Sequence, residues 1–351
     1  MAKKIKIIDK QGNEQEAHCP IIISASRSTD IPAFYAKWFI NRLKAGYVVW
    51  YNPFNQKPMH ISFRDTKAIV FWTKNPAPLI PYLKEIDAMG IKYYFQFTLN
   101  DYEFENLEPN VPKLQDRIST FKKLSELLGK ERVIWRFDPL ITTPTTSPRE
   151  LLTRIWRIGN ELKGYTEKLV FSFIDVKAYR KVQNNLIKET NLFTKDVVEF
   201  AEPTTEQITE ICEGLKAIQT KWREEGWDIL LATCAEEVDL SRYGIEHNKC
   251  VDGELMKRIF ADNVDLVHYI NYGKMPIKQD SLFPEFDTPI LKLANMKDKG
   301  QRKVCGCMVS KDIGMYNTCL HHCVYCYANT SRNVVISNVN NLDDDRESIL
   351  K

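Results

Sequence analysis

The sequence has no marked excess of either charge and no long apolar run. Its 351 residues include 49 Lys and Arg and 46 Asp and Glu, which leaves a formal net charge of +3. This balance is typical neither of a strongly basic nucleic-acid binder nor of an acidic, solvating chain. No stretch approaches the roughly 20 apolar residues that cross a bilayer, and the N-terminal residues lack the apolar core of a signal peptide. We therefore expect a cytoplasmic protein with no membrane partner.

Internal repeats, low-complexity segments and a recognised glycine-rich phosphate loop are also missing, so the sequence does not support the use of nucleoside triphosphates. What it does contain is 44% hydrophobic and 11% aromatic residues, enough to bury a large core. Its length suits one barrel-sized domain or two ordinary domains.

Nine cysteines stand out in a chain expected to lie in a reducing compartment, where stable disulfides are rare. Five of them crowd residues 305–326, whereas Cys19 and Cys212 are isolated along the sequence. Thiols at this density favour metal or redox chemistry over packing alone.

Short β-branched or aromatic runs alternate with longer amphipathic segments, which is typical of strands joined by helical crossovers. The sequence therefore predicts an α/β fold with a largely parallel sheet. The predicted strands are Ile21–Ser26, Ala68–Thr73, Tyr93–Thr98, Val133–Asp138, Leu169–Ile174 and Ile229–Thr233. Helices are expected to begin near Ile31, Pro78, Val111, Ser147, Thr204 and Gly253.

One helix start carries several signals together. Ser147 is a suitable cap, Pro148 occupies the first helical position, and Glu150 stands where a capping box requires an acid. Further along, residues 274–301 are rich in Pro, Asp and Lys, which predicts a linker across the surface. The chain thus divides into a body (residues 1–273), this linker, and a cysteine-rich tail (residues 302–351).

Polar side chains follow each predicted strand at the point where it ends. Because ligands in parallel α/β folds bind at the carboxyl ends of the strands, we expect these side chains to face one site. Helix caps and ion pairs at the rim are the alternative role for each of them. The series comprises Arg27, Asp30, Lys74, Asn75, Asn100, Arg136, Asp138, Asp175, Lys177, Cys234 and Glu236.

The strongest motif is Cys319-Leu-His-His-Cys323-Val-Tyr-Cys326, with gaps of three and two residues between its thiols. Three thiolates at this spacing can bind three irons of a [4Fe-4S] cluster and leave the fourth iron without a protein ligand. A zinc site is the alternative, since thiolates suit either metal, but a closed zinc site needs a fourth ligand. That ligand would come from Cys305, Cys307, His321 or His322.

This spacing, with Tyr325 before the last cysteine, resembles the signature of the radical S-adenosylmethionine superfamily. The segment from Tyr316 to Asn329 is similar to the cluster loop of spore photoproduct lyase and its relatives, in which a short strand leads into C-x-x-x-C-x-Y-C-Y-A. Further segments are similar to sequences that follow later strands in those relatives. They are Ser28–Pro32, Phe71–Pro76, Leu107–Pro109 with Arg117, and Arg136–Ile141.

The order of the segments differs from that in the lyases. There the cysteine loop follows the first strand, whereas here it lies after every other matching segment. The resemblance therefore implies a circularly permuted, TIM-like β/α barrel, partial or complete, in which the tail provides the strand and loop that would otherwise begin the barrel. Nearly the whole chain also resembles an uncharacterised bacterial and archaeal family noted for a C-terminal cysteine cluster like that of radical S-adenosylmethionine enzymes.

The resemblance implies that Cys319, Cys323 and Cys326 bind a [4Fe-4S] cluster whose open iron chelates S-adenosylmethionine. One electron from the reduced cluster would cleave the sulfonium to methionine and a 5′-deoxyadenosyl radical. A low-potential donor of the flavodoxin or ferredoxin type would supply that electron. The substrate stays open; likeness to a DNA-lesion lyase favours nucleic acid by analogy only, and the net charge does not reinforce it.

Residues that would hold S-adenosylmethionine also follow from the resemblance. Tyr325 would lie against the adenine. Lys74 and Arg136 are the candidates for binding its carboxylate, and Asp30 and Asn100 for binding its ribose.

A second set of cysteines remains after the motif and the two isolated ones. Cys305-Gly-Cys307 brings two thiols to the same side of an extended segment, and Cys234 and Cys250 raise the number to four. Four thiols match the ligands of a second [4Fe-4S] cluster, of a zinc ion, or of neither if they only pack. The competing function for the whole protein is a non-catalytic iron-sulfur or zinc protein, either an electron carrier or an interaction module.

Overall fold

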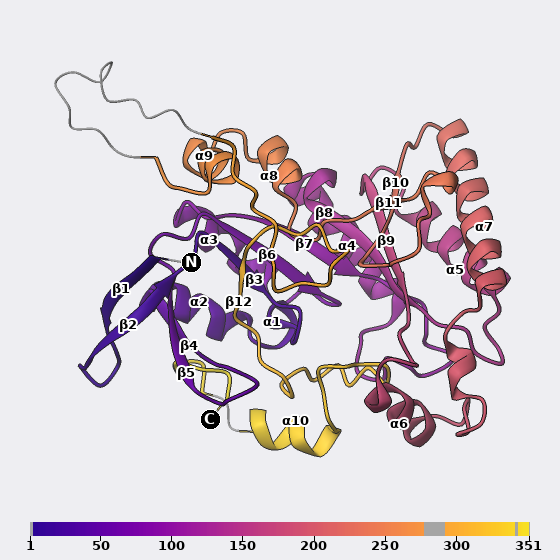
Figure 1. Cartoon of the computed structure of the whole chain (residues 1–351), viewed down its shortest axis with the longest axis horizontal. Coiled ribbons are helices and arrows are strands. Elements are labelled where there is room, and N and C mark those ends of the chain that lie inside the picture. The colour runs from indigo at the N-terminus through magenta and orange to yellow at the C-terminus, as the bar shows by residue number, and fades with distance from the viewer. Residues whose placement is uncertain (1–2, 277–291, 341–342, 351) are drawn as a thin grey trace.

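The computed structural model describes residues 3–276, 292–340 and 343–350, and its largest feature is a parallel sheet (Figure 1). The strands of this sheet are β3 (Ile22–Ala25), β6 (Ala68–Thr73), β7 (Lys92–Thr98), β8 (Val133–Leu140), β9 (Lys168–Phe173), β10 (Leu230–Thr233), β11 (Glu246–His247) and β12 (Lys311–Asp312). Their order is β11-β10-β9-β8-β7-β6-β3-β12, and every neighbouring pair is parallel. The predicted α/β fold with a largely parallel sheet is confirmed.

Helices connect most of these strands. They are α1 (Ile31–Phe34), α2 (Ala36–Ala45), α3 (Leu83–Ala88), α4 (Leu114–Leu128), α5 (Pro148–Glu161), α6 (Arg180–Glu189), α7 (Thr205–Glu224), α8 (Gly253–Ile259), α9 (Val264–Tyr272) and α10 (Arg332–Val339). Short 3₁₀ helices lie at Ile80–Tyr82, Lys130–Arg132, Val198–Ala201 and Ser241–Tyr243. In the described part of the chain, no helix combines the length and the apolar character that a bilayer crossing requires.

Helix α5 begins where the sequence predicted, but only half of its capping box forms. The Ser147 hydroxyl accepts a hydrogen bond from the Glu150 backbone N–H at 3.3 Å. The Glu150 carboxylate instead accepts from Arg154 Nε at 2.9 Å, one turn further along. A complete capping box occurs at α7, between Thr204 and Gln207.

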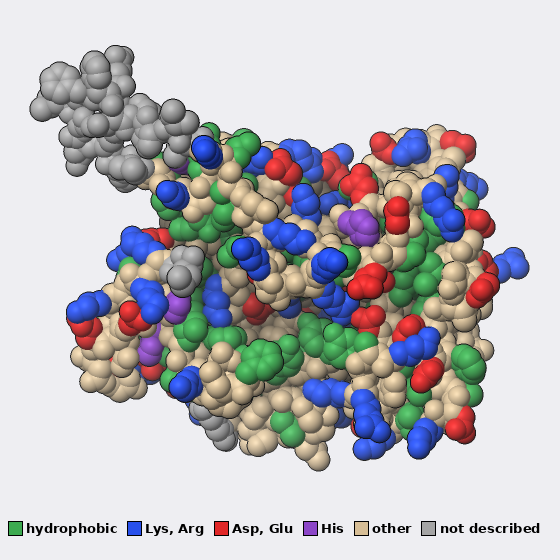
Figure 2. Space-filling view, viewed as in Figure 1, with side chains coloured by type: hydrophobic (Ala, Val, Ile, Leu, Met, Phe, Trp, Pro, Cys, Tyr) green, Lys and Arg blue, Asp and Glu red, His purple; other side chains and the backbone are tan. Residues whose placement is uncertain are grey.

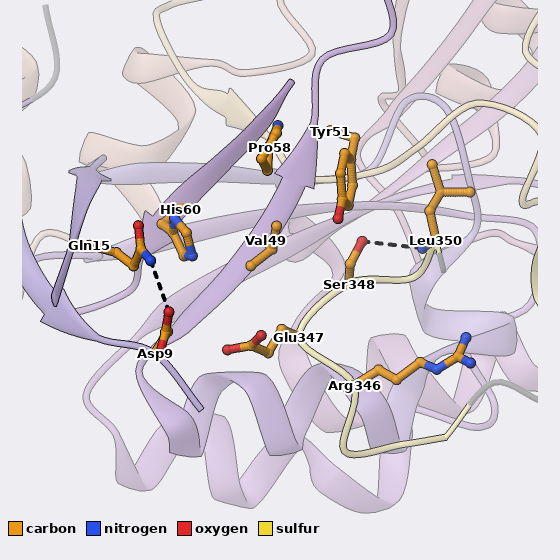
Figure 3. A pocket seen from close by; sticks show the side chains of 10 residues that line it. All are labelled: Asp9, Gln15, Val49, Tyr51, Pro58, His60, Arg346, Glu347, Ser348 and Leu350. Atoms are coloured by element: carbon orange, nitrogen blue, oxygen red, sulfur yellow. Dashed lines mark hydrogen bonds between the residues drawn. The ribbon is translucent and has the colours of Figure 1, made fainter. Parts of the chain in front are cut away.

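A second, four-stranded sheet lies beside the first and was not predicted. It contains β1 (Lys3–Ile8), β2 (Glu14–Cys19), β4 (Tyr47–Tyr51) and β5 (Pro58–Ser62) in the order β1-β2-β5-β4. The C-terminal residues pack on it, since Val49 N–H donates to the Glu347 carbonyl at 2.7 Å. A hollow between this sheet and the C-terminal residues is lined by Asp9, His60 and Glu347 among others, and contains none of the predicted site residues (Figure 3).

Side chains of the parallel sheet alternate between two buried faces, as successive residues of a strand must. One face packs against helices α2, α3, α4, α5 and α7, with side chains such as Phe71, Phe95 and Trp135 in the shared core. The opposite face packs against the segments around Cys250 and Cys307, with α8 beside them. Three of the predicted site cysteines, Cys250, Cys305 and Cys307, are therefore part of the layer that covers the second face, and Cys234 packs against it.

Strand β12 brings the tail to the edge of the sheet. Lys311 pairs with Ile23 and Asp312 with Ser24, and the Ile313 N–H continues the ladder to the Ser24 carbonyl at 3.1 Å. Strands β11 and β12 are the two edges in the described residues, and no pairing between them closes the sheet. Part of the predicted linker, residues 277–291, lies outside the described residues.

The contact between α5 and α7 generates a prediction about stability. A Cβ placed on Gly159 would lie 2.2 Å from the Trp222 ring, which stacks on Trp156 with ring centroids 5.7 Å apart. Alanine normally stabilises a helix interior by about 1 kcal/mol relative to glycine. Here we expect overpacking to prevail, so that Gly159→Ala lowers the free energy of unfolding in urea by about 1–3 kcal/mol.

Gly214→Ala is the matched control on the facing helix. Its Cβ would meet a terminal methyl of Leu152, also at 2.2 Å, but a leucine end can rotate away where a stacked indole cannot. The stability of this variant should stay close to that of the parent. Equal losses in the two variants would contradict the role given to the tryptophan stack.

Candidate metal and cofactor site

The three-cysteine loop is closed at its base and held against the strand ends. The Asn317 N–H donates to the Ala328 carbonyl at 3.1 Å, and Asn329 Nδ2 donates to the Cys319 carbonyl at 2.8 Å. Tyr35, which lies between α1 and α2, donates its hydroxyl hydrogen to the Thr318 carbonyl. The loop therefore has a fixed position even though it contains no regular helix or strand.

The thiols of Cys319, Cys323 and Cys326 are partly buried in this loop. Burial raises the pKa of Cys319 to about 12, and the neighbouring negative charges of Asp30 and Cys326 add to the rise. The Ala328 N–H donates to Cys326 Sγ at 3.3 Å, the kind of hydrogen bond that stabilises a ligating thiolate. Because a bound metal deprotonates the thiols it coordinates, these thiols would lose their protons on metal binding.

In the described residues, no three His, Cys, Asp or Glu side chains already surround the position of a single metal ion. Of the fourth ligands that a zinc site would need, His321 is bonded to Asp30 through Nε2 at 2.8 Å. Cys305 and Cys307 belong to a separate group of thiols, described below. A four-iron cluster would take each of the three thiols of the loop on a different iron, whereas zinc would still need a fourth ligand such as His322.

Tyr325 and Glu108 form the centre of a polar network next to the loop. Lys74 Nζ donates to Glu108 Oε1 at 2.7 Å and lies 3.0 Å from the Tyr325 hydroxyl, which also donates to Glu108. Asn100 Nδ2 lies 2.9 Å from Glu108 Oε1 and 3.2 Å from the same hydroxyl. Three of the predicted cofactor-binding residues, Tyr325, Lys74 and Asn100, are thus brought together.

The charge of Glu108 depends on two cations. Its burial alone would raise its pKa, but Lys74 and Arg117, whose Nη1 lies 3.7 Å from Glu108 Oε2, hold the pKa at about 2. Glu108 is therefore ionised and keeps Lys74 charged beside the cysteine loop.

Both carboxylate oxygens of Asp30 are hydrogen-bonded within the protein. Its Oδ1 accepts from the Ala33 N–H at 3.0 Å and caps α1, and its Oδ2 accepts from the Lys74 N–H at 2.7 Å. The same Oδ2 contacts His321 Nε2. The carboxylate thus ties the strand exit to the cysteine loop, and its contacts are those of a positioning residue.

Arg136 lies away from the loop, on the second face of the sheet. Its Nε donates to Asp138 Oδ2 at 3.1 Å, and its Nη1 lies 3.2 Å from Gln96 Oε1 and 3.1 Å from Cys250 Sγ. The guanidinium is buried, with 4% of its side chain exposed. These contacts assign Arg136 to the second group of thiols, whereas the sequence grouped it with Lys74.

The second group consists of Cys234, Cys250, Cys305 and Cys307, which the fold brings together from two segments. Cys234 Sγ and Cys250 Sγ are 3.4 Å apart, and the Cys250 N–H donates to Cys307 Sγ at 3.1 Å. The Cys305 thiol in turn lies next to Cys307. The predicted juxtaposition of these four thiols is present in the structure.

Of the remaining strand-exit residues, Asn75, Asp175 and Lys177 have the alternative role described above, in turns and in ion pairs at the rim. Asn75 Oδ1 accepts from the Ala77 N–H at 3.3 Å in a turn. Asp175 pairs with Arg302, and Lys177 with Glu202, both at the rim. By contrast, Asp138 accepts from Ser172 and Arg136, and the Glu236 carboxylate accepts from the Phe173 N–H at 2.9 Å.

Sequence reasoning missed several residues that contact the second thiol group. Gln96 Nε2 donates to the Cys250 carbonyl at 3.0 Å, and Tyr94 donates to the same oxygen. Tyr94 and Gln96 are two residues apart on β7, so their side chains lie on the same face of the sheet, and this much could have been read from the sequence. Asn248 Nδ2 lies 3.3 Å from Cys250 Sγ, and nothing in its sequence context indicated that contact.

A family model described as a domain of unknown function, DUF1848, matches residues 22–328. The chain belongs to this family. The match begins at β3 and includes both thiol groups; Asn329, which closes the cysteine loop, lies one position beyond it. No protein of curated function matches the chain. On the face of this DUF1848 protein seen in Figure 2, acidic and basic side chains are mixed, in line with the net charge of +3.

The buried network predicts a pH-dependent effect of Glu108→Gln. In the folded protein the Glu108 pKa is about 2 instead of 4.5, so its contribution to stability is complete above pH 4.5 and is lost as the pH falls toward 2. By the rule of 1.36 kcal/mol per pKa unit, we expect the variant to be less stable by about 3 kcal/mol at pH 7. Its deficit relative to the parent should shrink as the pH falls below 4.5.

Denaturant unfolding at several pH values measures this difference. Glu126→Gln, at an exposed position on α4, is the control and should match the parent throughout. A deficit of Glu108→Gln that stays constant down to pH 2.5 would show that the carboxylate charge is not what stabilises the network.

Proposed function

We propose that this DUF1848 protein is a radical S-adenosylmethionine enzyme whose parallel sheet is a circularly permuted β/α barrel, partial or complete. Cys319, Cys323 and Cys326 would hold its [4Fe-4S] cluster. When bound, the cluster and S-adenosylmethionine supply one-electron cleavage of the sulfonium and a carbon-centred radical. The protein's own residues position that chemistry.

The observation that carries the proposal is the meeting of the cysteine loop with the strand exits. Tyr325 and Lys74 are 251 positions apart in sequence, yet their polar atoms are 3.0 Å apart. Ligand chemistry in parallel α/β folds lies at the carboxyl ends of strands, and Lys74 and Asn100 follow β6 and β7 there. An electron carrier has no need of such a network around its cluster loop.

The position of β12 supports the permutation. In an unpermuted barrel, the strand before the cysteine loop comes first and lies beside the second strand. Here β12 precedes the loop, so the permutation predicts that β12 pairs with β3. β12 pairs with β3 and leads directly toward the loop. This pairing is what the proposed permutation expects of the tail.

Lys74 is the cation we assign to the carboxylate of S-adenosylmethionine. Its side chain is 15% exposed and its ammonium group lies next to the loop, so an incoming carboxylate can share it with Glu108. Asn100 is suited to a ribose hydroxyl, because its amide already lies beside the Tyr325 hydroxyl. Arg136 and Asp30 keep the partners described above and would support the site indirectly.

Formation of 5′-deoxyadenosine tests the proposed activity. We expect anaerobically reconstituted protein, given a low-potential reductant or a flavodoxin- or ferredoxin-type donor, to convert S-adenosylmethionine to 5′-deoxyadenosine and methionine. Replacing Cys319, Cys323 and Cys326 by alanine should abolish the product. Cys19→Ala/Cys212→Ala, which removes two isolated buried thiols, should leave it unchanged.

The same assay addresses the substrate. Arms with DNA, with RNA and with fractions of a cell extract should differ in product yield, and stimulation by a nucleic acid would support that substrate class. Reconstituted protein that holds four irons at the loop but forms no 5′-deoxyadenosine in any arm would contradict the enzymatic function.

Lys74→Met tests the carboxylate assignment. Loss of one charge-assisted hydrogen bond costs roughly 1.5–3 kcal/mol, so S-adenosylmethionine should bind about 10- to 100-fold more weakly in equilibrium dialysis. Iron content should not change, because Lys74 is not a proposed ligand. Lys177→Met, at the rim, is the control. Unchanged affinity in Lys74→Met would refute the assignment.

A further inference from the structure

We propose that Cys234, Cys250, Cys305 and Cys307 hold a second [4Fe-4S] cluster, separate from the cysteine loop and saturated by four protein thiolates. This site does not depend on the proposed enzymatic activity. It rests on the contacts among the thiols, on two neighbouring guanidinium groups, and on its place in the fold.

The thiols form a row that begins at Cys234 and ends at Cys305. Cys234 and Cys250 are 3.4 Å apart, Cys250 contacts Cys307, and Cys307 contacts Cys305. Cys250, Cys305 and Cys307 are each less than 9% exposed, so solvent does not separate them. Four adjoining thiols from two distant segments, three of them buried and Cys234 half-buried, are more than packing requires.

Two cations lie beside this row. Arg136 Nη1 is 3.1 Å from Cys250 Sγ, and its guanidinium is almost completely buried. The side chain of Arg27 lies near enough to Cys307, Cys250 and Cys305 for these thiols, with Asp312, to raise its pKa against the effect of burial. Its Nη2 is buried without a hydrogen-bond acceptor in the described residues. A cluster with four thiolates carries net negative charge; these two guanidinium groups, which also pair with Asp138 and Asp312, would offset part of it, and its sulfides would accept a hydrogen bond from Arg27.

Backbone and amide N–H groups also point at the sulfurs. The Cys250 N–H lies 3.1 Å from Cys307 Sγ, and Asn248 Nδ2 lies 3.3 Å from Cys250 Sγ. N–H donors of this kind stabilise ligating thiolates and help to set the potential of an iron-sulfur cluster. Asn248 supplies such a donor from outside the cysteine pattern.

A cluster and a zinc ion need different arrangements of the four thiolates. Around one zinc, they converge on a tetrahedron with Zn–S distances of about 2.3 Å, and no such convergence exists among the described side chains. A cubane takes each thiolate on a different iron, so the side chains of the row would rotate apart to bind it. We choose the cluster because its sulfides would add acceptors beside the buried Arg27 Nη2, and zinc is an outcome of the test below.

The location gives this cluster a structural consequence. Cys305 and Cys307 precede β12 in the tail, whereas Cys234 and Cys250 flank β11 at the opposite edge of the sheet. A shared cluster would join the two segments across the second face of the sheet. With all four irons bound to the protein, it would have no open position for S-adenosylmethionine.

Iron and sulfide analysis of the full chain, purified anaerobically, tests the proposal. We expect about eight irons and eight sulfides in the parent, about four in Cys319→Ala/Cys323→Ala/Cys326→Ala, and about four in Cys305→Ala/Cys307→Ala. Cys19→Ala/Cys212→Ala removes the same number of thiols as the latter variant and should keep all eight irons. After reduction, the triple variant should still show the electron paramagnetic resonance signal of one [4Fe-4S]⁺ cluster.

The triple variant leaves the four proposed ligands intact, so its result holds even if Cys305→Ala/Cys307→Ala does not fold. A triple variant without iron would overturn the second cluster. So would one equivalent of zinc without sulfide in that variant, or a Cys234–Cys250 disulfide found by mass spectrometry of the anaerobic parent. None of these outcomes would affect the assignment of the cysteine loop.

Discussion

The pairing of β12 with β3 is the constraint on which the site depends. Only two residue pairs form it, Lys311 with Ile23 and Asp312 with Ser24, so side chains must reinforce it. Asp312 Oδ2 accepts from the Arg27 N–H at 2.9 Å, and Trp50 Nε1 donates to the Gly314 carbonyl at 2.9 Å. The Lys311 ammonium lies 3.1 Å from the centroid of the Trp50 ring. Gly314 has no room for a Cβ, which would meet Ser26 Oγ at 1.7 Å.

This edge places the cysteine loop and two members of the second thiol group, Cys305 and Cys307, on the tail, and the same polar network connects the two groups. Asn100 links the two regions, because its Nδ2 contacts Tyr325 and its Oδ1 accepts from the Asp138 N–H at 2.8 Å. Asp138 then pairs with Arg136, which contacts Cys250. Each buried charge along this path has a partner of opposite sign, as burial requires.

The sequence was sufficient for the buried strands of the parallel sheet and insufficient for the second sheet, whose apolar β4 was also not predicted, and for very short strands. Strands such as β6 are apolar on both faces and are therefore recognisable as uninterrupted runs. β1 is half lysine and mostly exposed, β2 is mainly polar, and β12 has too few residues for any period, so none of them is an apolar run. The cysteine groups followed from spacing and number. The placement of Arg136 did not, because the partner of a buried charge depends on the facing layer, here the segment around Cys250.

The central claim is that the tail carries an iron-sulfur loop at the carboxyl ends of the parallel strands. Anomalous diffraction at the iron edge, from anaerobically grown crystals soaked with S-adenosylmethionine, tests it most directly. The account predicts a compact four-iron peak bonded to Cys319, Cys323 and Cys326, with the ligand's carboxylate beside Lys74. A zinc peak at these cysteines, or no metal there in protein that retains iron elsewhere, would contradict it.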